Sequence, residues 1–118
     1  MSNRLFQGVI HQMRGAIDRT VGIIDETGTI ISCSELGKIG EVNSAAAAQA
    51  FATNESTVFE GITYKTFGNQ IHPEYAVFID GEDEFAIKYA DLSAVTLNSL
   101  KQFFDEKYDR GIFIKNVI

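Results

Sequence analysis

The chain has 118 residues, of which 45% are apolar. This length suits a single domain that buries about two-thirds of the surface exposed by the unfolded chain. Its 16 acidic and 10 basic side chains give a formal charge of −6, which disfavours binding to phosphate backbones and anionic membranes. No apolar run approaches the roughly 20 residues of a membrane-spanning helix, and the N-terminal segment lacks the core of a signal peptide. We therefore expect a single cytoplasmic domain over residues 1–118 that binds neither nucleic acid nor membranes.

The beginning of the chain predicts a helix followed by a hairpin. Apolar residues recur at spacings of three and four over residues 3–19, as they do on one face of a helix. Two runs rich in β-branched residues, 21–25 and 29–33, flank a turn that contains Gly28. Because glycine adopts the positive φ that short hairpins need, this segment predicts a strand, a turn and a strand.

A loop and a second helix are predicted next. Residues 34–43 combine two glycines with several polar side chains, which is typical of a loop or of short helical turns. The alanine-rich segment 44–52 has high helix propensity, and Asn43 or Ser44 is positioned to cap it. Its small side chains favour close packing on a sheet.

The middle of the chain predicts three more strands. Residues 57–66 alternate between two sets of side chains with period two, as one strand does. Pro73 disfavours a strand through His72, and two further strands are predicted at 74–80 and 85–90, joined by an acidic turn.

The end of the chain predicts a helix with an unusual tail. Asp91 is a good N-cap for an amphipathic helix from residue 92 to about 109. Five of the last seven residues are apolar, whereas chain ends are usually polar. We expect the natural chain to continue past Ile118, with residues 110–118 beginning a linker to a downstream domain or pairing with a second copy.

These elements define an α+β fold in which about five antiparallel strands are flanked by N-terminal, alanine-rich and C-terminal helices. The order of elements resembles the PAS-like fold. The segment Val21–Glu41, which reads VGIIDETGTIISCSELGKIGE, is similar to part of the N-terminal sensory domain of transcriptional regulators of the sugar-diacid and purine-catabolism type. This resemblance implies a ligand-sensing domain that precedes a C-terminal helix-turn-helix.

We expect a ligand pocket between the alanine-rich helix, the loop 32–39 and one face of the sheet, because ligand sites are concave and mostly apolar with a few polar groups. The candidate binding residues are Ser32, Ser34, Lys38, Tyr64 and Lys65. Either lysine could balance an anionic ligand such as a carboxylate, although surface lysines are more often solvated.

Other reactive side chains favour structural roles. Cys33 ends an apolar strand, as expected of a small buried hydrophobe rather than of a redox sensor. His11 and His72 lack the spacing of metal ligands, and the acidic tips 25–26 and 80–84 are typical of solvated turns. The glycines match no phosphate-binding loop and no nucleophile motif is present. We therefore expect no metal, no cofactor and no enzymatic activity.

Three functions remain open at this point. The first is a sensor domain in which a small molecule changes the packing of the C-terminal helix. The second is a PAS-like module without a ligand, whose first and last helices form a homodimer interface. The third, a small enzyme, requires a cleft with a titratable cluster that the sequence does not assemble.

Overall fold

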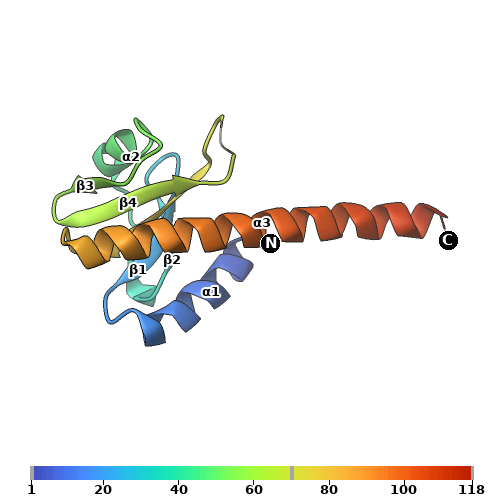
Figure 1. The fold of residues 1–118 in the computed structure, drawn as a ribbon, viewed down its shortest axis with the longest axis horizontal. Helices are drawn as coiled ribbons and strands as arrows, with labels where there is room; N and C mark the ends of the chain where they lie inside the picture. The colour runs from blue at the N-terminus through green and yellow to red at the C-terminus, as the bar shows by residue number, and fades with distance from the viewer. Residues whose placement is uncertain (1, 70, 118) are drawn as a thin grey trace.

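The computed structural model describes residues 2–69 and 71–117, and it describes side chains for residues 4–69 and 71–103. The elements in chain order are α1 (Ser2–Ala16), β1 (Val21–Asp25), β2 (Ile30–Cys33), the 3₁₀ turn η1 (Leu36–Lys38), α2 (Ser44–Ala50), β3 (Thr57–Phe59), β4 (Ile62–Phe67), β5 (Tyr75–Asp80) and α3 (Glu84–Val117). Figure 1 labels the three helices and the strands β1 to β4. The expected α+β class, with five antiparallel strands and three flanking helices, is confirmed.

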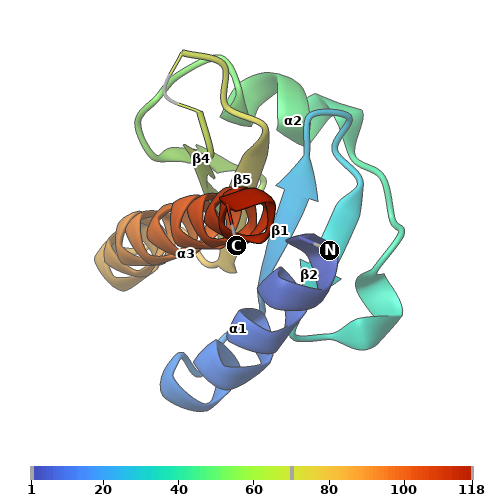
Figure 2. The same ribbon diagram turned by 90° about the vertical axis from the view of Figure 1, so that its right-hand side faces the viewer.

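The strands form one sheet with the order β2-β1-β5-β4-β3, and each neighbouring pair is antiparallel. The helices α1 and α3 cover one face, whereas α2 covers the other, which gives three layers (Figure 2). The central strands β1 and β5 are therefore covered on both faces. No helix in the described part of the chain is long and apolar enough to span a bilayer.

The layer beneath α1 and α3 holds the larger of two hydrophobic clusters. From α1, the ring of Phe6 packs edge-on against Phe67 and Tyr75, with ring centres 5.6 and 5.1 Å away. The helix α3 presents small side chains to the sheet, which lets its backbone lie close to β4 and β5. The buried members of this cluster are Phe6, Ile10, Ile17, Val21, Ile23, Phe67, Val77, Ile79, Ala86, Ala90, Ala94 and Leu97.

A side chain of α1 makes the hydrogen bonds that a neighbouring strand would make at the outer edge of β2. The Gln7 carboxamide donates to the Cys33 carbonyl and accepts from the Cys33 amide, both at 3.0 Å. Gln7 therefore satisfies the two backbone groups that an edge strand would otherwise present to solvent. This pair of hydrogen bonds fixes α1 relative to β2.

The predicted single strand over residues 57–66 is wrong, because a two-residue turn divides it. Glu60 and Gly61 have φ values of 51° and 78°, as in the type I′ turn of a tight hairpin. The segment thus forms β3 and β4, paired from Phe59 with Ile62 to Thr57 with Tyr64. The turn places Phe59 opposite Ile62, whereas a single strand would place Val58 on the same face as Ile62.

The predicted strand over residues 85–90 is also wrong, since this segment forms the first turns of α3. Asp83, rather than Asp91, caps the helix: its carboxylate accepts from the Ala86 amide and its carbonyl accepts from the Ile87 amide. Ala86 and Ala90 are buried while Phe85 is 61% exposed, a pattern of helical period. The sheet still has five strands, because residues 57–66 form parts of two strands rather than one.

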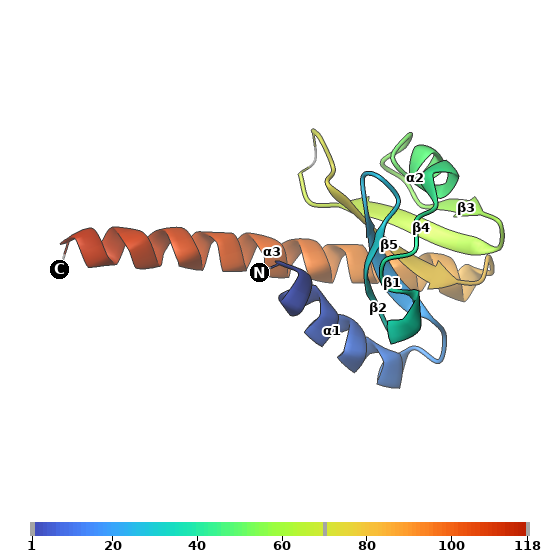
Figure 3. The ribbon, with the colours of Figure 1, turned by 180° about the vertical axis from the view of Figure 1, so that it is seen from behind.

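The helix α3 is longer at both ends than predicted. It begins at Glu84 and its backbone stays helical to Val117, through most of the segment predicted as a linker. Its C-terminal part projects well past the sheet (Figure 3), and the molecule measures 52 × 30 × 25 Å. The side chains of residues 104–118, and with them the predicted apolar tail, lie outside the described residues.

An ion pair ties the entry of β1 to the start of α3. The Arg19 guanidinium donates to both carboxylate oxygens of Asp83, with Nη2 2.7 Å from Oδ2. This bidentate pair lowers the pKa of Asp83 from 3.8 to about 2. Because the pKa of Asp83 is lower in the folded chain than in the unfolded chain, the ionised carboxylate stabilises the fold at pH values above its unfolded-state pKa. This stabilisation is lost as the pH falls through the folded-state pKa.

We expect Asp83→Asn to lower the melting temperature by a few degrees at pH 7 and by much less at pH 2. Asparagine retains an oxygen that can cap Ala86 but loses the charge that pairs with Arg19. Circular dichroism melts between pH 2 and pH 7 measure the difference. Asp91→Asn, at an exposed position on the same helix, is the matched control. An equal deficit at both pH values would show that the cost does not come from losing the charge that pairs with Arg19.

Candidate functional site

A cavity of about 240 Å³ lies between α2 and the sheet face that this helix covers. Apolar side chains form most of its wall, and three polar residues lie among them. Its lining residues are Ile24, Gly28, Ile30, Lys38, Glu41, Val42, Asn43, Ala46, Ile62, Tyr64 and Phe78. This is the region in which the sequence predicts a pocket.

The hairpin turn at one side of the cavity is held by a single carboxylate. Asp25 Oδ1 accepts from the amides of Thr27 and Thr29 at 3.0 and 3.1 Å, and from the Thr27 hydroxyl at 2.6 Å. Gly28 then has a φ of 89°, and a β carbon there would lie 2.2 Å from the Asn43 carbonyl oxygen. Only glycine allows the hairpin turn and the returning loop to approach this closely.

The loop after β2 folds back along the hairpin and closes the cavity. The Ile30 amide donates to the Glu41 carbonyl at 2.9 Å, and the Asn43 amide donates to the Gly28 carbonyl at 3.0 Å. These bonds bring residues 40–43 alongside the start of β2, with Val42 opposite Thr29. The backbone at the mouth of the cavity is therefore hydrogen-bonded rather than free.

The helix α2 begins at the mouth and contributes small side chains. The Asn43 side chain accepts from the Ala46 amide at 3.0 Å, so Asn43 is the observed N-cap of the two predicted candidates. Ala46, Ala47 and Ala50 face the sheet and are buried. Because alanine extends only one carbon from the helix, the space above the sheet is incompletely filled.

Two of the lining residues, Phe78 and Tyr64, belong to a row of residues that crosses the sheet. Cys33, Gly22, Phe78 and Tyr64 occupy successive strands at one level, on the α2 side. The Phe78 ring lies over Gly22, where a β carbon would be 2.4 Å from the ring. Gly22 therefore permits the position that Phe78 takes in the cavity wall.

Charged groups at the cavity are mixed in sign. Lys38 Nζ lies 3.7 Å from a Glu35 carboxylate oxygen, and Glu41 also lines the cavity. Burial raises the pKa of Tyr64 above the ordinary value of a phenol, which is already protonated at neutral pH, and its hydroxyl can donate or accept a hydrogen bond. The site can hold a small molecule with an apolar body and a few polar groups.

Two of the five predicted binding residues, Lys38 and Tyr64, line this cavity. Ser32 and Lys65 do not, because they lie on the face covered by α1 and α3. Ser32 is opposite Ile23 and Lys65 is opposite Val77, and both of these partners belong to the α1 and α3 cluster.

Ser34 also lies away from the cavity. Its hydroxyl oxygen accepts from the Val21 amide at 3.0 Å and is buried beside the entry of β1. The predicted buried role of Cys33 is confirmed, and burial raises the pKa of its thiol. In the described part of the chain, no three His, Cys, Asp or Glu side chains gather as a metal site would need.

Most of the cavity wall was not predicted as a site. The missed side chains are Ile24, Ile30, Glu41, Val42, Asn43, Ala46, Ile62 and Phe78. In the sequence, the apolar residues of this set look like ordinary core residues. The alternation of side chains between the two faces of β4 and β5 is the signal that could have placed Phe78 beside Tyr64.

Comparisons of the chain with protein-family models, with curated proteins and with solved structures found no match. A function for this chain therefore has to be argued from the cavity, from the surfaces of the helices and from the sequence pattern.

We expect Gly22→Ala to destabilise the fold by about 2–3 kcal/mol, since the new methyl group would overlap Phe78 and the Ser32 carbonyl. Urea unfolding followed by circular dichroism measures this loss. Gly37→Ala is the matched control because a β carbon there meets no atom within 4 Å, and it should change stability by less than about 0.5 kcal/mol. Equal stability of the two variants would mean that the Phe78 ring moves aside at no cost.

Proposed function

We propose that this chain is a cytoplasmic small-molecule-sensing domain of a transcriptional regulator, which transmits ligand binding to a downstream DNA-binding segment. The observation that carries this proposal is the cavity between α2 and the sheet, with Tyr64, Phe78 and Lys38 among its lining residues. The resemblance of Val21–Glu41 to the sensory domain of sugar-diacid and purine-catabolism regulators, within a PAS-like order of elements, supports the same function.

The size and lining of the cavity favour a metabolite. Its volume of about 240 Å³ is below the usual range of about 300–1,000 Å³ for drug-sized ligands, so it suits a smaller molecule. Two aromatic rings provide apolar contact, while Lys38, Glu41 and Asn43 provide hydrogen-bonding groups. A carboxylate ligand would place its charge near Lys38, in competition with Glu35.

Occupancy of the cavity has a physical route to α3. The β5 strand contributes Phe78 to the cavity wall and its neighbour Ile79 to the cluster beneath α1 and α3. A ligand that shifts Phe78 thus acts on the same strand against which α3 packs. Since α3 continues past the sheet, a small change in its packing becomes a larger displacement at its far end.

We expect one compound from a screen of small carboxylic acids, sugars and purines to raise the melting temperature by several degrees. Ala46→Leu should abolish this shift by filling the cavity, whereas Ala48→Leu, at an exposed position of α2, should retain it. Thermal-shift titrations of the three proteins measure the effect. A flat response from folded wild-type protein, or a shift that persists in Ala46→Leu, would contradict sensing at this cavity.

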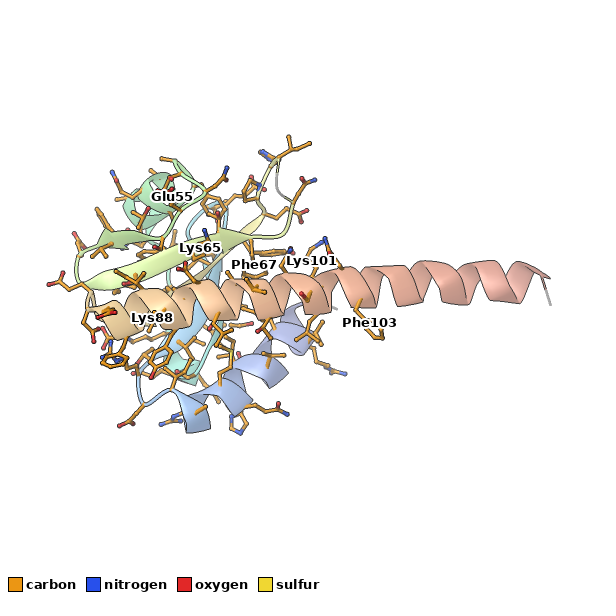
Figure 4. The ribbon with its side chains drawn as sticks, viewed as in Figure 1. Glu55, Lys65, Phe67, Lys88, Lys101 and Phe103 are labelled. Atoms are coloured by element: carbon orange, nitrogen blue, oxygen red, sulfur yellow. The ribbon has the colours of Figure 1, made fainter. Side chains whose placement is uncertain are left out.

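A second candidate function, homodimerisation without a ligand, is favoured by the exposed face of α3. Phe85, Leu92 and Phe103 are 61%, 66% and 64% exposed. Their spacings of seven and eleven residues are close to whole turns, so they follow one line along the helix. Figure 4 places Phe103 where α3 extends past the sheet. Such an apolar line suits pairing with the same helix of a second copy.

If α3 forms this interface, Leu92→Glu should convert a dimer to a monomer by placing a charge in the contact. Ile71→Glu, a change of the same kind at a loop position that is 93% exposed, should leave the dimer intact. Sedimentation velocity at several protein concentrations distinguishes these outcomes. Wild-type protein that stays monomeric at high concentration would contradict the interface.

A further inference from the structure

A second hollow is larger than the cavity under α2 and distinct from it. It has a volume of about 450 Å³ and lies on the opposite side of the sheet, between the end of β4, the loop that follows it and α3. Figure 4 shows Lys65 and Phe67 on β4 beside this helix. The lining residues are Asn54, Lys65, Thr66, Phe67, Gly68, Asn69, Pro73, Ala94, Val95 and Asn98.

The polar lining of this hollow is composed only of neutral and positive groups. It contains three asparagines, one threonine and one lysine, and no Asp or Glu is among its lining residues. The chain as a whole has 16 acidic residues against 10 basic ones. The lining residues themselves therefore favour a negative over a positive ligand, while Glu74 lies next to the lining residue Gly68.

The donors of the hollow are held in place by the fold. Lys65 Nζ donates to the Asn54 carbonyl, a neutral acceptor, and none of the ion pairs in the described part of the chain includes Lys65. Asn98 Oδ1 accepts from the Gly68 amide at 3.1 Å. This bond orients the planar carboxamide of Asn98, whose other end is an NH₂ donor.

We propose that this hollow is a second binding site, specific for a small oxyanion such as a carboxylate or a phosphate group. Lys65 supplies the charge, and the amides of Asn54, Asn69 and Asn98 supply hydrogen bonds. The bound anion touches the sheet through Lys65 and the helix α3 through Asn98. The site does not depend on the cavity under α2, and its occupancy acts directly on the helix that leaves the domain.

The test is an NMR titration of ¹⁵N-labelled protein with inorganic phosphate and with malonate, at constant ionic strength, with glycerol as the neutral probe. We expect saturable shifts of the Gly68 and Asn69 amides with at least one anion and none with glycerol. Lys65→Met keeps the aliphatic stem but removes the charge, and should weaken binding at least tenfold. Lys88→Met, nearer the start of α3 and paired with Glu84, is the matched control.

A second variant keeps the test decisive if Lys65→Met does not fold. Asn98→Asp retains the oxygen that accepts from Gly68 but places a carboxylate in the hollow, so it should abolish anion binding. Ala46→Leu should leave anion binding unchanged, because that residue lines the other cavity. Absence of saturable shifts, equal shifts with glycerol, or equal weakening by Lys88→Met would overturn the proposal.

Discussion

The structure depends on the covering of one small sheet on both faces. Because β1 and β5 lie in the middle, their side chains are buried in both directions. Along β1, Val21 and Ile23 fill the layer beneath α1 and α3, whereas Ile24 faces α2. The two layers are filled differently, since the first receives large side chains from α1 and the second receives mainly alanines. A cavity under α2 follows directly from that difference.

Polar contacts, rather than apolar area alone, fix where the helices lie on the sheet. Gln7 joins α1 to the edge of β2, the Arg19 and Asp83 pair joins the start of α3 to the entry of β1, and Asn98 joins α3 to the end of β4. The face that α3 turns to the sheet is mostly alanine and offers few large side chains to interlock with the strands. Directional bonds at defined positions therefore help to fix where α1 and α3 lie.

The sequence predicted the fold well wherever its local signals agreed with one another. The hairpin of residues 21–33 and the alanine-rich helix had matching turn, cap and propensity signals, and both are present. The two wrong strand predictions arose where the apolar pattern fitted two structures. Residues 85–90 alternate as in a strand, but Ala86 and Ala90 also lie on one face of a helix. The N-cap at Asp83, which is paired with Arg19, favours the helix.

The site was less predictable because it depends on which face each strand residue occupies. The ladder between β1 and β2 shifts by one residue between Ile23 and Ile24, and this irregularity sets Ser32 opposite Ile23, on the face away from α2. No local sequence signal marks such a shift.

The same alternation gives β4 its position between the two hollows. Tyr64 lines the cavity under α2, and its neighbour Lys65 lines the hollow beside α3, because successive residues of a strand point to opposite faces. The helix α3 packs against this strand and is bonded to its end at Gly68. The two proposed sites, although separated by the sheet, thus share one strand that contacts α3.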